Sequence, residues 1–114
     1  MSNYKADRFA EDLRREISAI IPVLKDPRIG TMLSVVRCEV AGDKSFAKVY
    51  ISSLDGIAAA KEAVRGLESA QGFIKRELNA KLRMRVCPEL KFIADDSIEH
   101  SSYISNMLNK INKD

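Results

Sequence analysis

Residues 57–82 read IAAAKEAVRGLESAQGFIKRELNAKL, and their pattern determines the arrangement of the whole domain. The apolar residues of this stretch return at helical spacing, at Ile57, Ala60, Val64, Leu67, Ile74, Leu78 and Leu82. Gly72 interrupts this pattern, and a glycine inside a helix costs about 1 kcal/mol relative to alanine. We therefore predict two consecutive helices with a short break within Ser69-Ala70-Gln71-Gly72. Gly66, inside the first of them, predicts close packing of that helix against a sheet.

A helix and a β-hairpin are predicted before this stretch. Apolar residues recur at helical spacing from Phe9 to Leu24, and Pro22 is expected to end or kink this helix in its last turn. Residues 33–40 and 45–53 predict two strands. Gly42 lies between them, where a tight turn needs a positive φ. On the first strand one face carries Val36, Cys38 and Val40; on the second, Ala47, Val49 and Ile51 face one way and Phe46, Lys48 and Tyr50 the other.

A third strand and a last helix are predicted after the helix pair. The strand covers residues 89–94 and is entered through Pro88. Asp96 and Glu99 have the spacing of a capping box, and an apolar stripe follows at Ile104, Met107, Leu108 and Ile111. The predicted order is helix, strand, strand, helix, kink, helix, strand, helix. This indicates one α+β domain over residues 1–114, with a three-stranded sheet covered on one face by helices.

Composition excludes several classes of protein. The 114 residues are 46% hydrophobic and 31% charged, which is typical of a soluble globular domain. There is no run of about 20 apolar residues that could span a bilayer, and the N-terminal residues do not resemble a secretory signal, so we expect a cytoplasmic protein without a membrane partner. Cys38 and Cys87 are far apart and are expected to be buried, reduced thiols. With His100 as the single histidine, we expect no metal site and no cofactor.

The positive charge is concentrated in one segment. The net charge of the chain is +3, whereas residues 65–85 alone carry six bases and two acids. A local excess of one sign favours a polyanionic partner over an ordinary solvated helix face. The candidate RNA-binding residues are Lys75, Arg76, Lys81, Arg83 and Arg85.

The element order and the short break resemble a type II KH domain, in which a GXXG loop between two helices clamps a nucleic-acid backbone. Here that loop is replaced by Ala70-Gln71-Gly72, which resembles the Ala-X-Gly kink of the ribosome-binding factor A family. Further segments carry the same resemblance, in order: Asp26-Pro27-Arg28-Ile29, Asp43, Ala47-Lys48-Val49-Tyr50-Ile51-Ser52, Lys75, Leu78, Arg85, Pro88-Glu89-Leu90, Phe92 and Asp95-Asp96-Ser97-Ile98.

The resemblance implies a ribosome assembly factor that is not an enzyme. Its partner would be the small ribosomal subunit in its immature form, with rRNA contact through the basic surface and importance at low temperature. Ala70 and Gly72 would be structural residues of the kink, with Gly72 letting the two helices meet closely. Other assembly factors, such as a GTPase, are candidate partners, and we expect a monomer.

Several alternatives stay open. Arg28 is a sixth candidate RNA-binding residue; alternatively it caps the first helix or pairs with Asp26. Phe46 and Tyr50 either stack on bases or belong to the fold. A general single-stranded RNA-binding KH module is the second functional hypothesis, although the missing GXXG argues against it. A small hydrolase built around His100 or Asp95-Asp96 is the third, but neither Ser101 nor Ser102 lies in a glycine-rich nucleophile elbow.

Overall fold

The computed structural model describes residues 4–30, 32–84 and 87–95. Its elements are, in chain order, α1 (Tyr4–Ile20), the short 3-10 helix η1 (Ile21–Val23), β1 (Leu33–Val40), β2 (Phe46–Ser53), α2 (Ile57–Ser69), α3 (Gln71–Leu82) and β3 (Glu89–Ala94). The order predicted from the sequence is confirmed up to β3, including the break after Ser69. The helix predicted from Asp96 onward lies outside the described residues.

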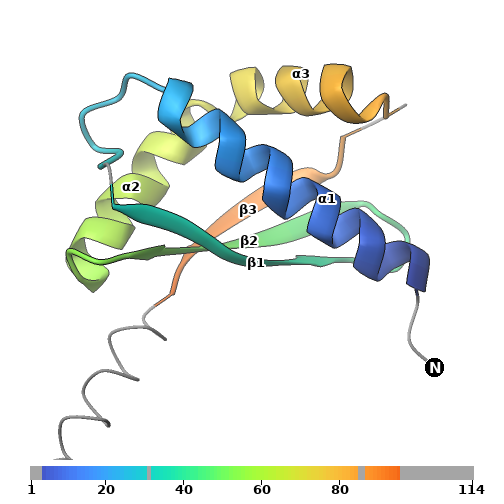
Figure 1. Cartoon of the computed structure of the whole chain (residues 1–114), viewed down its shortest axis with the longest axis horizontal. Helices are drawn as coiled ribbons and strands as arrows, with labels where there is room; N and C mark the ends of the chain where they lie inside the picture. Colours follow the sequence, from blue (N-terminus) through green and yellow to red (C-terminus); the bar gives the residue numbers. More distant parts are fainter. Residues whose placement is uncertain (1–3, 31, 85–86, 96–114) are drawn as a thin grey trace, which may run out of the picture.

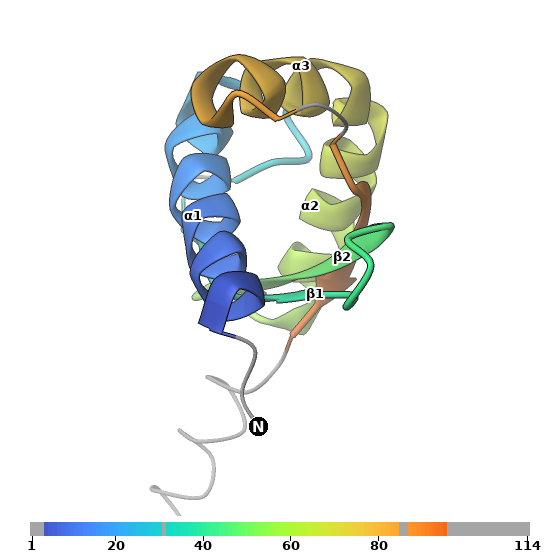
Figure 2. The same cartoon turned by 90° about the vertical axis from the view of Figure 1, so that its right-hand side faces the viewer.

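The three strands form one mixed sheet with β2 in the middle. β1 pairs with β2 in antiparallel fashion, as a hairpin requires, and β3 pairs with β2 in parallel. Parallel neighbours need a crossover, which α2 and α3 provide. The described helices all lie on the same face of the sheet (Figures 1 and 2). Within the described residues, no helix is long and apolar enough to cross a bilayer.

The core lies between the helices and the inner face of the sheet. Ala47, Val49 and Ile51 of β2 are fully buried, as their alternation predicts. They pack in one cluster with apolar residues of the helices, which include Leu13, Ile17, Leu67, Ile74 and Leu78. The break therefore lies at a fixed place, because the helices on both sides of it contribute to the same core.

β1 contains an irregularity that changes which residues face the core. Its pairing with β2 passes from Val35 to Arg37, so that Val36 is an extra residue in the strand. Because an extra residue shifts the alternation by one, Val35 faces the core and is 5% exposed. The prediction that Val36 shares the inner face with Cys38 and Val40 is wrong at Val36; Val35 takes that place.

The hairpin turn is closed by a hydrogen bond from the Lys44 N–H to the Ala41 carbonyl, 2.8 Å long. We predicted a positive φ at Gly42; in the structure Lys44 has the positive φ of this turn, at 60°. The carboxylate of Asp43 accepts the N–H of Ser45 at 3.0 Å, a local side-chain bond that helps to hold this conformation. The chain therefore reverses without using the conformational freedom of Gly42.

Candidate nucleic-acid interface

Ala70 alone separates α2 from α3. Its N–H donates to the carbonyls of Gly66 and Leu67, both at 3.1 Å, and its own carbonyl accepts the N–H of Ile74 at 3.0 Å. With φ −91° and ψ 6°, Ala70 thus ends one helix and begins the next. Gly72 is exposed, and a Cβ added to it would meet nothing within 4 Å. The prediction that Gly72 lets the helices meet closely is wrong, because the backbone of Ala70 makes the kink.

Hydrogen bonds between side chains hold the break between α2 and α3 in place. Arg28 donates from Nη2 to the hydroxyl of Ser69 at 3.1 Å, and it binds the carboxylate of Asp26 through Nε and Nη2 at 3.0 and 2.6 Å. Glu68 accepts a hydrogen bond from Nε2 of Gln71 across the break, at 2.9 Å. Of the alternatives for Arg28, the structure therefore shows the pairing with Asp26. The hydrogen bond of Glu68 across the break was not predicted from the sequence.

Gly66 allows the loop after η1 to lie against α2. A Cβ at this position would lie 2.7 Å from Cγ1 of Ile29 and 3.3 Å from Cγ of Asp26. The prediction of close packing at Gly66 holds, but its partner is the Asp26–Ile29 loop and not the sheet. Since Arg28 belongs to this loop, the packing at Gly66 also places Arg28 beside the end of α2.

The outer side of α3 carries exposed cations. Ile74 and Leu78 point into the core, so that Arg76, two positions from each, faces outward. Lys81 follows Leu78 by three positions and lies on the side of α3 toward α1, near Glu16 and Glu77, with its side chain exposed. Arg83 caps the helix in the left-handed conformation, with φ 51°, and is exposed as well. Arg76 and Arg83 lie seven positions apart, about two helical turns, and so on one side of the helix. Neither these two residues nor Lys81 forms an ion pair within the described part of the chain.

The remaining predicted site residues differ from this group. Lys75 is half-buried, and its Nζ lies 2.7 Å from Oε2 of Glu89 on β3, so its charge is balanced within the protein. Arg85 lies outside the described residues. The structure thus leaves Arg76, Lys81 and Arg83 exposed on α3 and its C-terminal cap, and we call these three cations the α3 basic surface; Lys75 and Arg28 are set apart in ion pairs.

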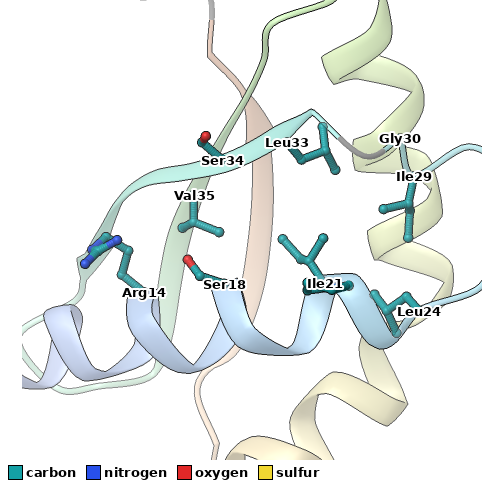
Figure 3. Close-up of a pocket in the computed structure, with 10 residues that line it drawn as sticks. Arg14, Ser18, Ile21, Leu24, Ile29, Gly30, Leu33, Ser34 and Val35 are labelled. Carbon is teal, nitrogen blue, oxygen red and sulfur yellow. The ribbon is translucent and has the colours of Figure 1, made fainter.

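A groove of about 470 Å³ lies between α1, η1, the following loop and β1. Side chains from α1 and β1 point toward one another across it, among them Ser18 and Val35 (Figure 3). Its lining is largely aliphatic; Arg14 is the charged residue there, and its guanidinium is bound by Glu11.

Across residues 4–30, 32–84 and 87–95, no three histidine, cysteine or acidic side chains gather as a metal site would require. His100 and Asp96 lie outside these ranges.

The fold and this surface define a class of protein: a KH-like α+β domain whose helix pair is joined by a one-residue kink and ends in exposed cations. The family model described as "Ribosome-binding factor A" matches residues 5–108. The chain belongs to this family.

Individual relatives agree with the family match. The ribosome-binding factor A of Clostridium tetani is 42% identical over 112 residues, covering 97% of this chain and 93% of the relative. The crystal structure of ribosome-binding factor A from Thermus thermophilus matches with a TM-score of 0.70 at 27% identity, over 78% of this chain and 93% of that one. A homology model of the Thermus thermophilus factor, fitted into the electron microscopy map of a 30S–RbfA complex, matches with a TM-score of 0.67 at 26% identity, over 80% of this chain and 96% of the other.

Proposed function

We propose that this protein binds the small ribosomal subunit during its assembly, through contacts of the α3 basic surface with rRNA. One observation carries the proposal: Arg76, Lys81 and Arg83 are all exposed, without an ion-pair partner in the described residues, on the helix that follows the kink and on its C-terminal cap. The family relationship supports the identity of the partner, because the Thermus thermophilus relative was placed in a 30S complex.

The chemistry of this surface suits the RNA backbone better than the bases. Lysine and arginine side chains neutralise phosphates and release bound counterions, so affinity falls steeply as salt rises. Such contacts position a protein on a folded RNA but carry little sequence information. The kink itself presents Ala70-Gln71-Gly72 in place of a GXXG loop, which favours docking onto a folded rRNA surface over a general single-stranded RNA-binding KH module.

The biological role that we propose is to assist maturation of the subunit, including processing of its precursor rRNA, with most importance at low temperature. The protein acts without catalysis of its own and without a cofactor, as a cytoplasmic monomer. Other assembly factors, such as a GTPase, are further partners in this role. These finer assignments rest on the family relationship and not on particular contacts in the structure.

Sedimentation with purified subunits tests the proposal. The wild-type protein is expected to co-sediment with small subunits but not with large subunits, and less so at higher salt. The variant Arg76→Gln/Lys81→Gln/Arg83→Gln should bind more weakly, and the slope of log affinity against log salt should fall by about 0.9 for each phosphate that is no longer neutralised. Circular dichroism would check that the variant is folded.

A matched control removes three other cations. Arg14, Arg15 and Arg65 each pair with an acid three positions earlier on the same helix. The variant Arg14→Gln/Arg15→Gln/Arg65→Gln changes the net charge equally and should bind subunits like the wild type. Equal weakening of both variants would show that net charge alone drives binding. Equal binding of the wild type to every RNA would favour the general RNA-binding module.

A further inference from the structure

The face of the sheet opposite the helices carries cations and aromatic rings on neighbouring strands. The pairing register brings Lys48 of β2 beside Glu39 of β1 and Lys91 of β3. In the next row, Tyr50 lies between Arg37 and Ile93. The described helices pack on the other face (Figure 2). We call the group of Arg37, Phe46, Lys48, Tyr50 and Lys91 the outer sheet surface.

Arg37 and Tyr50 form a stacked pair. The guanidinium carbon of Arg37 lies 4.0 Å from the centroid of the Tyr50 ring, and about half of the arginine side chain (52%) stays exposed. The hydroxyl of Tyr50 donates to Glu39 at 2.7 Å, and Arg37 lies 3.6 Å from the same carboxylate. Arg37 also approaches Asp95, at 3.9 Å. The arginine is therefore held over the ring by contacts on several sides, while its far side faces solvent.

A second pair of this kind lies one strand away. Nζ of Lys91 is 4.7 Å from the centroid of the Phe46 ring. Lys48 lies on β2 between Phe46 and Tyr50, and it forms no ion pair with any described residue. The acids beside this surface are already bound: Glu39 by Tyr50 and Arg37, and Glu89, which lies next to Phe46 in the pairing register, by Lys75. The outer sheet surface therefore presents two lysines, Lys48 and Lys91, that form no ion pair with a described residue, beside two aromatic rings.

This combination suits unpaired nucleotides. Exposed bases stack on aromatic rings and on arginine guanidinium planes, and lysines beside them neutralise the phosphates. A base-paired duplex hides the faces of its bases, so it would use the lysines but not the stacked Arg37. An acidic peptide would need the nitrogen edge of the Arg37 guanidinium, which already lies beside Glu39 and Asp95, and it would leave the face of the guanidinium unused.

We infer that the outer sheet surface is a second RNA site, which binds a single-stranded stretch by stacking a base on Arg37 and holding phosphates at Lys48 and Lys91. The inference rests on the proposed function only in taking this stretch to be rRNA of the subunit. It would give the protein two RNA contacts on different sides of the domain, a folded backbone at α3 and an unpaired segment at the sheet.

Titration of the isotope-labelled full chain with a short unstructured oligouridylate, followed by NMR, tests the site without the ribosome. Signals of Arg37, Lys48, Tyr50 and Lys91 should shift, while those of Arg76 and Lys81 shift less. Fluorescence anisotropy should show about fivefold weaker binding for Arg37→Lys, which keeps the charge but removes the planar group. Lys48→Gln/Lys91→Gln should lower the salt slope by about 0.7 for each phosphate that the variant no longer neutralises.

The control variant Lys25→Gln/Lys61→Gln removes two exposed cations outside this surface and should bind the oligomer like the wild type. Shifts confined to α3, or no loss of affinity in Arg37→Lys with an intact spectrum, would overturn the inference and leave the proposed function standing. Equal binding of polyglutamate would also overturn it. Sheet signals that shift in a protein that fails to co-sediment with small subunits would support this site while rejecting the proposed function.

Discussion

Gly66 of α2 lies directly against Ile29, so closely that a Cβ at position 66 would be 2.7 Å from Cγ1 of Ile29. Real side chains do not approach to this distance, so any larger residue at position 66 must push the loop away from the helix. The same loop carries Arg28, which is bonded to Ser69 at the end of α2. The contact between Gly66 and Ile29 is therefore the point at which the loop is fixed beside the kink.

Gly66→Ala is expected to destabilise the protein by about 1–3 kcal/mol, because overpacking outweighs the better helix propensity of alanine. Gly72→Ala is the matched control. A Cβ there meets nothing within 4 Å, and the position is helical, so this variant should be as stable as the wild type or more stable by up to about 1 kcal/mol. Urea unfolding measures both. A loss of stability in Gly72→Ala would restore a packing role for Gly72.

Asp26 and Arg28 make the stability of the protein dependent on pH at acidic values. The hydrogen bonds from Arg28 lower the pKa of the Asp26 carboxyl from 3.8 to about 2. A carboxyl whose pKa is lowered by folding stabilises the folded state above its unfolded pKa and stops doing so as the pH falls through its folded pKa. Asp26→Asn should therefore be less stable than the wild type at pH 7. The difference should shrink between about pH 4 and pH 2 in urea unfolding series.

Ser69→Ala separates the two contacts of Arg28, since it removes the hydroxyl but keeps the ion pair with Asp26. Its stability relative to the wild type should be the same at pH 7 and at pH 2. If the deficit of Asp26→Asn instead persisted unchanged at low pH, the ion pair would not be its cause.

Periodicity was sufficient to predict the elements, because each of them buries one face in a common core. The helix pair is an example: Leu67 and Ile74 lie on opposite sides of the break, and both are fully buried. Details that depend on a single backbone conformation could not be predicted. The extra residue Val36 in β1 and the positive φ of Lys44 leave no mark in a pattern of polar and apolar residues.

Ion pairs between residues on different elements also could not be predicted from the sequence. Lys75 and Arg76 are adjacent and equally basic, yet Lys75 points to Glu89 on β3 and Arg76 points outward. The pair of Arg28 with Asp26 is local, within one loop, and was one of the alternatives predicted from the sequence, whereas Glu89 reaches Lys75 from a different element, β3. A count of charges along residues 65–85 therefore located the basic segment. It could not show which of its cations are paired within the protein and which are exposed without an ion pair.

The two thiols should differ in reactivity from ordinary cysteines. Burial raises the pKa of Cys38 from 9.0 to about 12, and burial also raises the pKa of Cys87. Because the thiolate is the reactive form, alkylation of Cys38 in the native Cys87→Ser variant at pH 8 should be at least about a hundredfold slower than in urea. Mass spectrometry of iodoacetamide-treated samples measures this rate. Equal rates in buffer and in urea would show that Cys38 is accessible in the folded protein.

The pair Lys75 and Arg76 offers the sharpest test of where RNA binds. Arg76 has no acidic partner in the described residues, so Arg76→Gln should weaken binding to small subunits and lower the salt slope by about 0.9. Lys75 is held by Glu89 at 2.7 Å and half-buried, so Lys75→Gln should change affinity less than Arg76→Gln does. The two variants have the same net charge and alter neighbouring residues, so long-range electrostatics affects both alike. A larger loss in Lys75→Gln would mean that the lysine leaves Glu89 to reach RNA, and would move the site toward β3.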